Sequence, residues 1–215
     1  FKIAQPTVFI SIPKRWIQIR EQVAATIPIE KSEEKAIKEV TQSITGENLK
    51  WGLSAAGFLD TDIFKFFHQN DINLMSGYGM TEATGGITMT PPKEYIANSV
   101  GKVLPGIELK LGEDDELLMR GPYVSTGYYK DGIAGSHING WFYSGDIFRY
   151  KKGHYFIVDR KKEIYKNSRG ETISPQKIEN LFQDFESIRS VFLVGDGQEF
   201  NTILLYPEPD RKSTR

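Results

Sequence analysis

The residues with the clearest capacity for chemistry lie in one glycine-rich run, Ser76–Gly86. Within it, Tyr78 offers a flat face for a ring, Thr81 a hydroxyl for a phosphate oxygen, and Glu82 a hard oxygen ligand for Mg²⁺. Glycine permits backbone angles and close approaches that other residues forbid, so this run predicts a loop around a nucleotide whose α-phosphate is attacked. A glycine-rich turn with incidental polar residues is the alternative, because short motifs often match by chance.

Further segments, located after this run, carry a family resemblance. They are Arg120–Pro122, Gly127–Asp131, Gly140–Asp146, Asp159–Ile164, Gly170 and Ile173–Glu179. Together with Tyr78–Glu82, and in the same order, they resemble the motifs of the adenylate-forming enzymes: acyl-CoA synthetases, firefly-type luciferases and peptide-synthetase adenylation domains. The opening Gln5–Trp16 resembles the corresponding segment of long-chain acyl-CoA synthetases.

The resemblance implies an enzyme in the intact protein, a long-chain fatty acid–CoA ligase. It would join the acid to the α-phosphate of ATP, expel pyrophosphate and pass the acyl group to CoA, with Mg²⁺ as cofactor. Medium-chain or aryl acids are the nearest alternative substrates. Two rival functions stay open: an adenylating enzyme that loads an acyl carrier protein, and a non-catalytic AMP-binding module.

The resemblance also assigns roles around the glycine-rich run. Thr81 and Glu82 are expected to be catalytic, with Thr81 donating to an α-phosphate oxygen and Glu82 holding Mg²⁺. Tyr78 is expected to stack against adenine, and Gly77 and Gly79 to leave room for the acyl chain beside the adenylate. The backbone that cradles adenine, usually richer in glycine in this family, is matched by Ala55, Ala56 and Gly57. An exposed carboxylate and a core tyrosine are the ordinary alternatives for Glu82 and Tyr78.

The later motifs carry the remaining expected roles. Asp146 would bind both ribose hydroxyls, since a carboxylate has two oxygens for two adjacent donors. Arg160 would contact ribose and phosphate, and Lys162 matches the hinge about which the family's small domain turns. Lys166 is expected to be catalytic, and Gly170 to line the tunnel that admits the thiol of CoA. The ordinary alternatives are a turn aspartate for Asp146, a surface salt bridge for Arg160 and a solvated linker for the charged run Arg160–Lys162.

Two parts of the family pattern are missing from these 215 residues. There is no Ser/Thr/Gly-rich phosphate loop ending in Pro-Lys-Gly, and no catalytic lysine in its usual late motif. Lys212 lies in a polar tail without that motif. Because these parts supply the main positive charges on the phosphates, we expect a fragment with little adenylation activity alone.

Composition excludes several other classes of function. A hydrophobic fraction of 39% with 12% aromatic residues supports a folded core. A net charge of −1 lacks the basic excess of nucleic-acid-binding proteins. Cysteine is absent, which excludes disulfides and thiolate nucleophiles, and the sequence has no apolar run long enough to cross a bilayer. We expect a cytoplasmic protein, with peripheral membrane contact as a further option.

The elements that must position these residues alternate between strands and helices. The pattern predicts a buried strand at Thr7–Ile10, helices starting at Pro13 and Ser32, a strand at Trp51–Ser54, a helix capped by Asp60, and a short strand at Leu74–Met75. This order is typical of a mixed α/β sheet, with the ligand loop at the carboxyl end of a strand.

From about Val100 onward the pattern changes to short strands separated by turns. They are predicted at Val100–Val103, Ile107–Leu111, Glu116–Met119, Phe148–Lys151 and Tyr155–Val158. This favours a small β-barrel-like region that completes the C-terminal part of the large domain, residues 1–159. Residues 160–215 are expected to form a truncated α+β lid domain. It would contain a helix capped by Ser174, with a stripe that includes Leu181 and Phe185, and strands at Val191–Val194 and Ile203–Tyr206.

Overall fold

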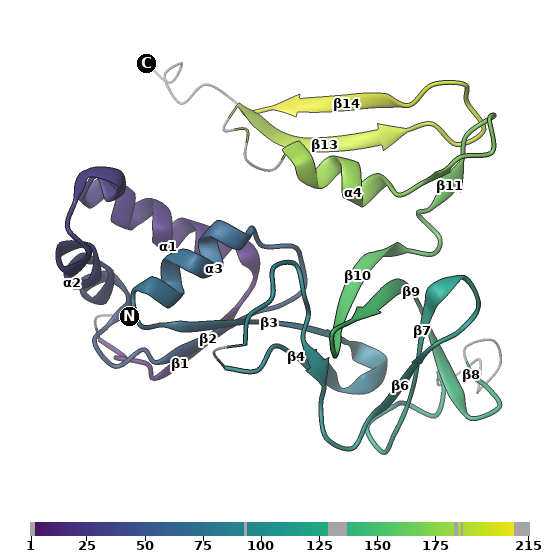
Figure 1. Ribbon diagram of the computed structural model, residues 1–215, viewed down its shortest axis with the longest axis horizontal. Helices are drawn as coiled ribbons and strands as arrows, with labels where there is room; N and C mark the ends of the chain where they lie inside the picture. The colour runs from purple at the N-terminus through teal and green to yellow at the C-terminus, as the bar shows by residue number, and fades with distance from the viewer. Residues whose placement is uncertain (1–2, 93, 129–136, 183–184, 186, 209–215) are drawn as a thin grey trace. The chain divides into compact units, whose positions relative to one another are not determined.

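The computed structural model of the chain describes residues 3–92, 94–128, 137–182, 185 and 187–208 (Figure 1). The chain divides into two units: residues 1–109, 119–142 and 150–156 form the first, and residues 110–118, 143–149 and 157–215 the second. The domain boundary expected after residue 159 stays a prediction. Tyr129–Asp131 of the predicted connecting segment and Lys212 lie outside the described residues.

A five-stranded mixed sheet underlies the first unit. Its strands lie in the order β1 (Val8–Ser11), β2 (Trp51–Ser54), β3 (Asn73–Met80), β4 (Gly85–Met89) and β5 (Lys102–Val103). The pairs β1–β2 and β2–β3 are parallel, whereas β3–β4 and β4–β5 are antiparallel. The predicted α/β fold with a mixed sheet is therefore confirmed.

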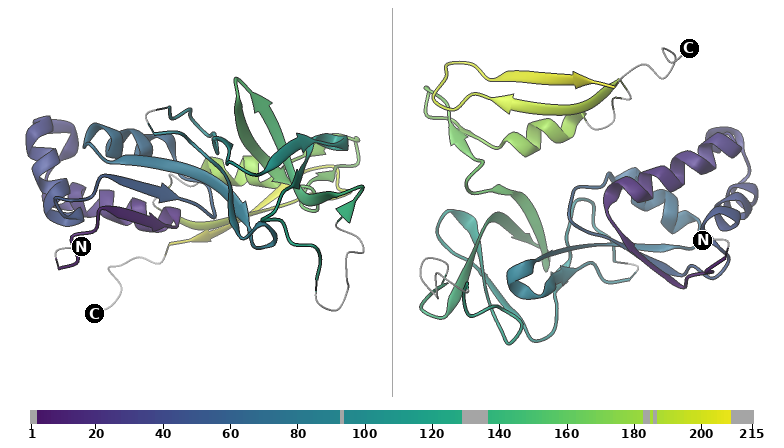
Figure 2. Two further views of the ribbon diagram at one scale, coloured as in Figure 1. Left: turned by 90° about the horizontal axis from the view of Figure 1, so that it is seen from below. Right: turned by 180° about the vertical axis from the view of Figure 1, so that it is seen from behind.

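Three helices accompany this sheet: α1 (Pro13–Thr26), α2 (Glu34–Thr45), which packs against α1, and α3 (Thr61–Gln69). Figures 1 and 2 show α1 and α3 over one face of the sheet. The fully buried Trp16 of α1 connects the sheet with α3. Its ring meets Phe9 of β1 and Phe67 of α3 edge-on, at centroid distances of 5.1 and 5.0 Å. The predicted helices are thus confirmed, and Asp60 caps α3 by accepting from the Asp62 amide. No helix in the described part of the chain is long and apolar enough to span a membrane.

The first strand is less buried than the sequence predicts. β1 is an edge strand, and its side chains alternate between the two faces of the sheet. Phe9 faces α1 and contacts Trp16, whereas Ile10 is 61% exposed. The expectation of a buried strand at Thr7–Ile10 is wrong because an apolar run cannot say whether both faces of its sheet are covered.

The predicted β-rich region forms a second sheet, except that the strand predicted at Val100–Val103 is β5 and pairs with β4 in the first sheet. Its strands lie in the order β10 (His154–Arg160), β9 (Trp141–Lys151), β7 (Glu116–Arg120) and β6 (Glu108–Leu111), and β8 (His137–Ile138) pairs with β9. β9 is far longer than the predicted Phe148–Lys151. The Gly140–Asp146 motif therefore enters a strand directly at Trp141.

The second unit ends in small antiparallel ribbons around a short helix. β11 (Tyr165–Lys166) pairs with β12 (Thr172–Ile173), and β13 (Ile188–Val194) pairs with β14 (Thr202–Pro207), as predicted for the last two strands. Between them α4 (Pro175–Glu179) is followed by a 3-10 turn, η4 (Asn180–Phe182). The predicted stripe is wrong at Leu181 and Phe185, which are exposed because the helix ends before them.

The cap of α4 also differs from the prediction. The Ser174 side chain makes no capping bond to the helix and instead donates to the carboxylate of Asp159. Asp159, which is fully buried, accepts from the Gln176 amide at 3.3 Å. An acceptor remote in the sequence therefore serves the first turn, which a local sequence pattern cannot reveal.

A buried histidine stabilises the first unit near β10. Nδ1 of His154, a residue only 2% exposed, lies 3.0 Å from Oγ of the buried Ser99. The same hydroxyl accepts from the Gly101 amide at 2.8 Å. The Val100 amide donates to the Tyr155 carbonyl beside them, so the histidine lies within a continuous backbone network.

We expect the first unit to lose stability as the pH falls below about 6.5. Burial, aided by the Lys102 charge and opposed by Glu94, lowers the pKa of His154 below its ordinary value of 6.5. The imidazole of His154 therefore binds a proton more readily in the unfolded chain than in the folded one. The free energy of unfolding should fall as the pH drops below the ordinary histidine pKa of 6.5. Urea unfolding from pH 7.5 to 5 would measure this, and a H154Q variant should show a shallower decline. Parallel declines for the two proteins would contradict the assignment.

Candidate functional site

The three parallel strands place the first candidate residues at one edge of their sheet. Ser11, Ser54 and Ser76 are in register across β1, β2 and β3. β1 and β2 end at this level, whereas β3 continues to Met80. The predicted adenine cradle therefore leaves β2 at the level where the glycine-rich part of β3 begins.

The cradle contains an unusual backbone conformation. Ala56 has φ 64°, in the left-handed region, and it is exposed together with Gly57. For a residue with a Cβ this region costs about 1–2 kcal/mol, and such strain concentrates at functional sites. The Ala55 amide is anchored to the Ser11 carbonyl at 3.3 Å. The strain explains why glycine would suit this segment, while contact with adenine stays a prediction.

The glycine-rich run is a hairpin rather than the expected loop. β3 extends through Met80, a 3-10 turn, η2 (Thr81–Ala83), comes next, and β4 begins at Gly85. The Thr84 amide donates to the Thr81 carbonyl at 3.1 Å, and Thr84 itself has φ 53°. Only this tight turn is loop-like, and it presents Thr81 exposed and Glu82 half-buried at adjacent positions.

The glycine at position 79 is required by this hairpin. Gly79 pairs with Gly86, and a Cβ at Gly79 would lie 1.8 Å from the Gly85 carbonyl oxygen. The space that a side chain at Gly79 would need is therefore occupied by β4, while the room expected for the acyl chain stays a prediction. A contact between the Gly79 backbone and a nucleotide stays a prediction.

Tyr78 is more enclosed than an open stacking platform. It is only 9% exposed, and its hydroxyl lies 3.8 Å from the Met80 sulfur. Most of the ring is therefore already in contact with protein. Stacking against adenine stays a prediction.

Glu82 is held by two partners from the segment after β7. Its Oε1 accepts from the Tyr128 hydroxyl at 2.7 Å, and its backbone carbonyl accepts from the Ser125 amide at 2.6 Å. The bond to Glu82 raises the pKa of the Tyr128 hydroxyl, with burial adding to the effect. Tyr128 belongs to the Gly127–Asp131 motif, but no sequence pattern connects it with Glu82.

The chemistry of this turn fits Mg²⁺ bound together with a nucleotide. Within the described ranges, no group of three or more His, Cys, Asp or Glu residues could hold a metal alone. Mg²⁺ commonly binds one or two carboxylates and completes its shell with phosphate oxygens and water. The single half-exposed carboxylate of Glu82 suits that mode, in which the nucleotide supplies further ligands.

The second unit brings together the two residues predicted to recognise ribose. Arg160 Nε, at the end of β10, lies 3.9 Å from Asp146 Oδ1 on β9. The Asp146 side chain is 18% exposed, while that of Arg160 is mostly exposed. The pair therefore offers a partly accessible carboxylate beside an accessible guanidinium, and its binding to ribose stays a prediction.

The predicted hinge and thiol-tunnel residues lie further along the second unit. Lys162 is exposed in the turn after β10, and Lys166 is exposed at the end of β11. Gly170 lies in a turn with φ 79°, and its amide donates to the Asn167 carbonyl at 2.9 Å. Oδ1 of Asn167, which is buried, accepts from the Arg169 and Glu171 amides, so this turn is well supported. The assigned roles of Lys162, Lys166 and Gly170 stay predictions.

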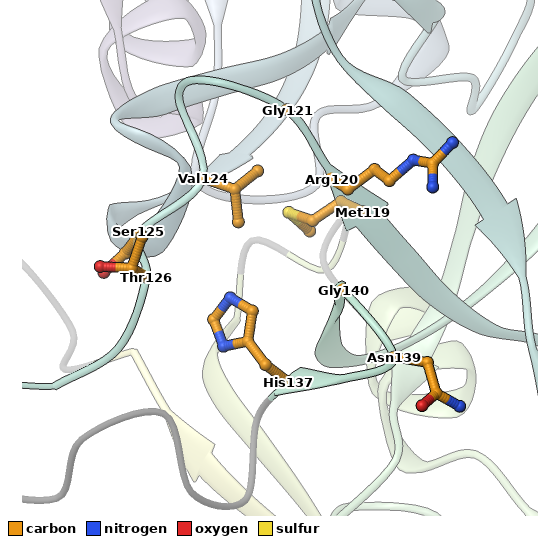
Figure 3. A pocket seen from close by; sticks show the side chains of 9 residues that line it. All are labelled: Met119, Arg120, Gly121, Val124, Ser125, Thr126, His137, Asn139 and Gly140. Atoms are coloured by element: carbon orange, nitrogen blue, oxygen red, sulfur yellow. The ribbon is translucent and has the colours of Figure 1, made fainter.

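A cavity of about 450 Å³ lies in the first unit, adjoining the Glu82 turn. Figure 3 shows the His137 ring and the Met119 side chain turned toward its interior, while the Arg120 guanidinium points away. Arg120 instead pairs with Glu108 at 2.6 Å. The cavity wall includes Ser125, whose amide holds the Glu82 carbonyl. No sequence signal indicates this cavity, because β7, residues 121–126 and residues 137–140 form it together.

Comparison with known proteins identifies the family to which the chain belongs. Residues 2–129 match the family described as AMP-binding enzymes. The chain belongs to this family.

Two similar proteins of known sequence differ in the acids that their names give. One, from Mycobacterium tuberculosis, is named "Putative fatty-acid–CoA ligase fadD11"; it is 32% identical over 185 residues, which are 84% of this chain and 32% of that protein. The other, the 2-succinylbenzoate–CoA ligase of Listeria monocytogenes, is 32% identical over 69% of this chain and 32% of its own length. The chain thus spans about a third of the length of these relatives.

The fold is also found in a solved structure, that of the O-succinylbenzoate coenzyme A synthetase (MenE) of Bacillus subtilis in complex with AMP. The TM-score is 0.76 at 17% identity, over 99% of this chain and 43% of that one. This likeness establishes a shared fold.

Proposed function

We propose that this chain works within a longer protein that is an AMP-forming long-chain fatty acid–CoA ligase. The observation that carries the proposal is the turn between β3 and β4, where the Thr81 hydroxyl and the Glu82 carboxylate stand at adjacent positions. The chain that forms this turn belongs to the AMP-binding family. The phosphate loop and the late catalytic lysine would come from other parts of the longer protein. The protein would act in the cytoplasm, with peripheral contact to membrane lipid.

The proposed residues address the main obstacle of adenylation, the repulsion between a carboxylate and the phosphates of ATP. Thr81 would donate to an α-phosphate oxygen, and Glu82 would hold Mg²⁺. When bound, Mg²⁺ offsets negative charge on the phosphates and on the departing pyrophosphate. Asp146 would accept from the two ribose hydroxyls, and Arg160 would add a cation beside ribose and phosphate. These groups bind and orient the reactants, which is the larger part of catalysis in phosphoryl-type transfers.

The second half-reaction would use the small domain. Lys162 lies in the exposed turn after β10, where a change of backbone angles could reorient the residues C-terminal to it. The Lys166–Gly170 turn would then approach the thioester site, with Lys166 taking part in the chemistry and Gly170 leaving passage for the thiol arm of CoA. In the alternative that loads an acyl carrier protein, a folded partner would dock at the same place.

The identity of the acid is tested by ATP–pyrophosphate exchange. The intact protein would be assayed with fatty acids of increasing length and with 2-succinylbenzoate. We expect exchange to peak with long chains, in keeping with the Gln5–Trp16 segment; a peak with the aryl acid would replace the proposed substrate. CoA and acyl carrier protein would then be compared as acceptors. No exchange with any acid, in a folded protein that binds AMP, would favour the non-catalytic module.

Replacing Tyr128 with Phe is expected to weaken Mg²⁺-dependent exchange moderately. The change removes the hydroxyl that donates to Glu82 Oε1 and leaves the ring in place. A hydrogen bond to a charged group contributes about 1.5 kcal/mol or more, and the exposure of Tyr128 weakens it, so the rate at subsaturating Mg²⁺ should fall by up to about tenfold. Exchange measured across a Mg²⁺ titration tests this, with Y150F as the control because Tyr150 is also exposed. An unchanged titration curve for Y128F would show that Glu82 does not need this partner.

A further inference from the structure

A buried carboxylate outside the assigned motif residues lies in the second unit, next to the candidate ribose-binding pair. Glu116 opens β7, and its side chain is only 7% exposed. A buried carboxylate is costly unless both oxygens find donors. Here Oε1 accepts from the Gly145 amide at 3.0 Å, and Oε2 accepts from the Lys161 ammonium at 2.9 Å.

The two partners of Glu116 flank the candidate ribose-binding pair. Gly145 immediately precedes Asp146, and Lys161 comes immediately after Arg160. Lys161 also donates its backbone amide to the Gly145 carbonyl at 2.7 Å. Both backbone polar groups of Gly145 are thereby bonded, which ties β9 to the end of β10 at the position where Asp146 and Arg160 meet.

The backbone at this position needs such support. Gly145 has φ 74° within β9, a conformation that interrupts the regular strand and turns the next residue. The Asp146 amide is held in turn by the Ser144 hydroxyl at 3.1 Å. The direction of the Asp146 side chain therefore depends on how firmly Gly145 is fixed.

Lys161 is fixed by charge as well as by its backbone. Besides Glu116 it faces Asp114, whose Oδ2 lies 3.6 Å from the ammonium. The bond to Glu116, with the nearby Asp114 charge, raises the pKa of Lys161. The ammonium thus stays charged and bound at neutral pH, which leaves the neighbouring Arg160 guanidinium to face Asp146.

We propose that Glu116 and Lys161 are positioning residues that hold Asp146 and Arg160 in the arrangement that recognises the two hydroxyls of a ribose. The inference rests on the proposed function, since it takes Asp146 as the acceptor for ribose. Two adjacent hydroxyls require both carboxylate oxygens at a set orientation, and a rotated Asp146 would keep only one of the two bonds. The expected consequence of losing Glu116 is therefore lost discrimination against 2′-deoxynucleotides.

The test compares the binding of AMP and 2′-deoxy-AMP to the intact protein by calorimetry. For wild type we expect AMP to bind tenfold or more tightly, because a hydrogen bond to a charged group is worth about that factor or more. In E116M, which removes both acceptor oxygens at similar length, the affinity ratio should approach one. E116Q keeps an acceptor for the Gly145 amide but loses the charge facing Lys161, so its ratio should be intermediate.

Two further variants keep the test decisive. K161M alters a half-exposed side chain and should reduce the ratio even if E116M folds poorly. E113Q is the matched control, because Glu113 is exposed in the 3-10 turn η3 (Glu113–Asp115) just before Glu116. The affinity ratio of E113Q should equal that of wild type.

A purely structural role would lower the folded fraction and leave the ratio of affinities unchanged. Folded E116M and K161M proteins with the wild-type ratio would overturn the inference, as would a wild type that binds both nucleotides equally. Exchange activity is a separate readout. An intact protein without carboxylate-dependent exchange, whose E116M variant still loses the preference for AMP, would refute the proposed reaction and support the positioning role.

Discussion

Replacing Glu82 with Gln is expected to lower ATP–pyrophosphate exchange by the intact protein about 100-fold or more, the range found when one charged or hydrogen-bonding group at a transition state is removed. Glu82 lies at the tip of the β3–β4 hairpin, where its carboxylate accepts from the Tyr128 hydroxyl and its backbone carbonyl accepts from the Ser125 amide. Gln preserves the shape and can still accept from Tyr128, but it lacks the negative charge that favours Mg²⁺. Exchange at a fixed saturating acid concentration, over a range of Mg²⁺, measures the loss.

The charge-removing control is E39Q, since Glu39 is an exposed residue of α2. It should leave exchange unchanged within about twofold, because surface substitutions away from a site have small effects. A loss in E82Q that is no larger than in E39Q would remove Glu82 from the metal site. The thermal unfolding of E82Q should match that of wild type, which separates lost chemistry from lost folding.

Replacing Gly79 with Ala is expected to destabilise the first unit by about 3 kcal/mol or more, at or beyond the usual cost of overpacking. The new Cβ would lie 1.8 Å from the Gly85 carbonyl oxygen and 2.5 Å from its carbon. Both are backbone atoms of the paired strand, so no side-chain rotation can relieve the clash. Urea unfolding of the chain, monitored by tryptophan fluorescence, measures the change.

The matched control is G86A, at the register partner of Gly79 on β4. A Cβ there would meet its nearest neighbour, the flexible end of Leu104, at 3.4 Å, an ordinary contact. We expect G86A to change the unfolding free energy by less than about 1 kcal/mol. Equal losses for the two variants would show that the hairpin tolerates no side chain on either strand, and that the close approach at Gly79 is not the cause.

The elements predicted well from sequence are those whose signals are local. α1 and α3 are indicated by apolar residues at helical spacing, and α3 also by its Asp60 cap, because each helix bonds its own backbone within a few residues. β2 at Trp51–Ser54 was predicted with its exact bounds. The antiparallel pair β13–β14 was also anticipated, since only a short turn-rich segment separates its strands.

The elements predicted poorly depend on partners elsewhere in the chain. Glycines usually indicate loops, yet Gly77 and Gly79 belong to a strand because β4 pairs against them at close range. In the same way β9 runs through the Gly140–Asp146 motif because it pairs with its neighbours in the second sheet. Strand pairing overrides local preference, and no local pattern states which strand will pair.

The sequence by itself determined the family, the α/β fold and the residue types of the candidate site, because motifs and periodicity are properties of short segments. Only the tertiary structure decided what holds those residues. Tyr128 meets Glu82 across 46 positions, and Glu116 reaches Gly145 and Lys161 across 29 and 45. Such contacts form only when strands distant along the chain are brought into register. They depend on how distant parts of the chain pack together, and the pattern of residues within a short segment carries no information about that packing.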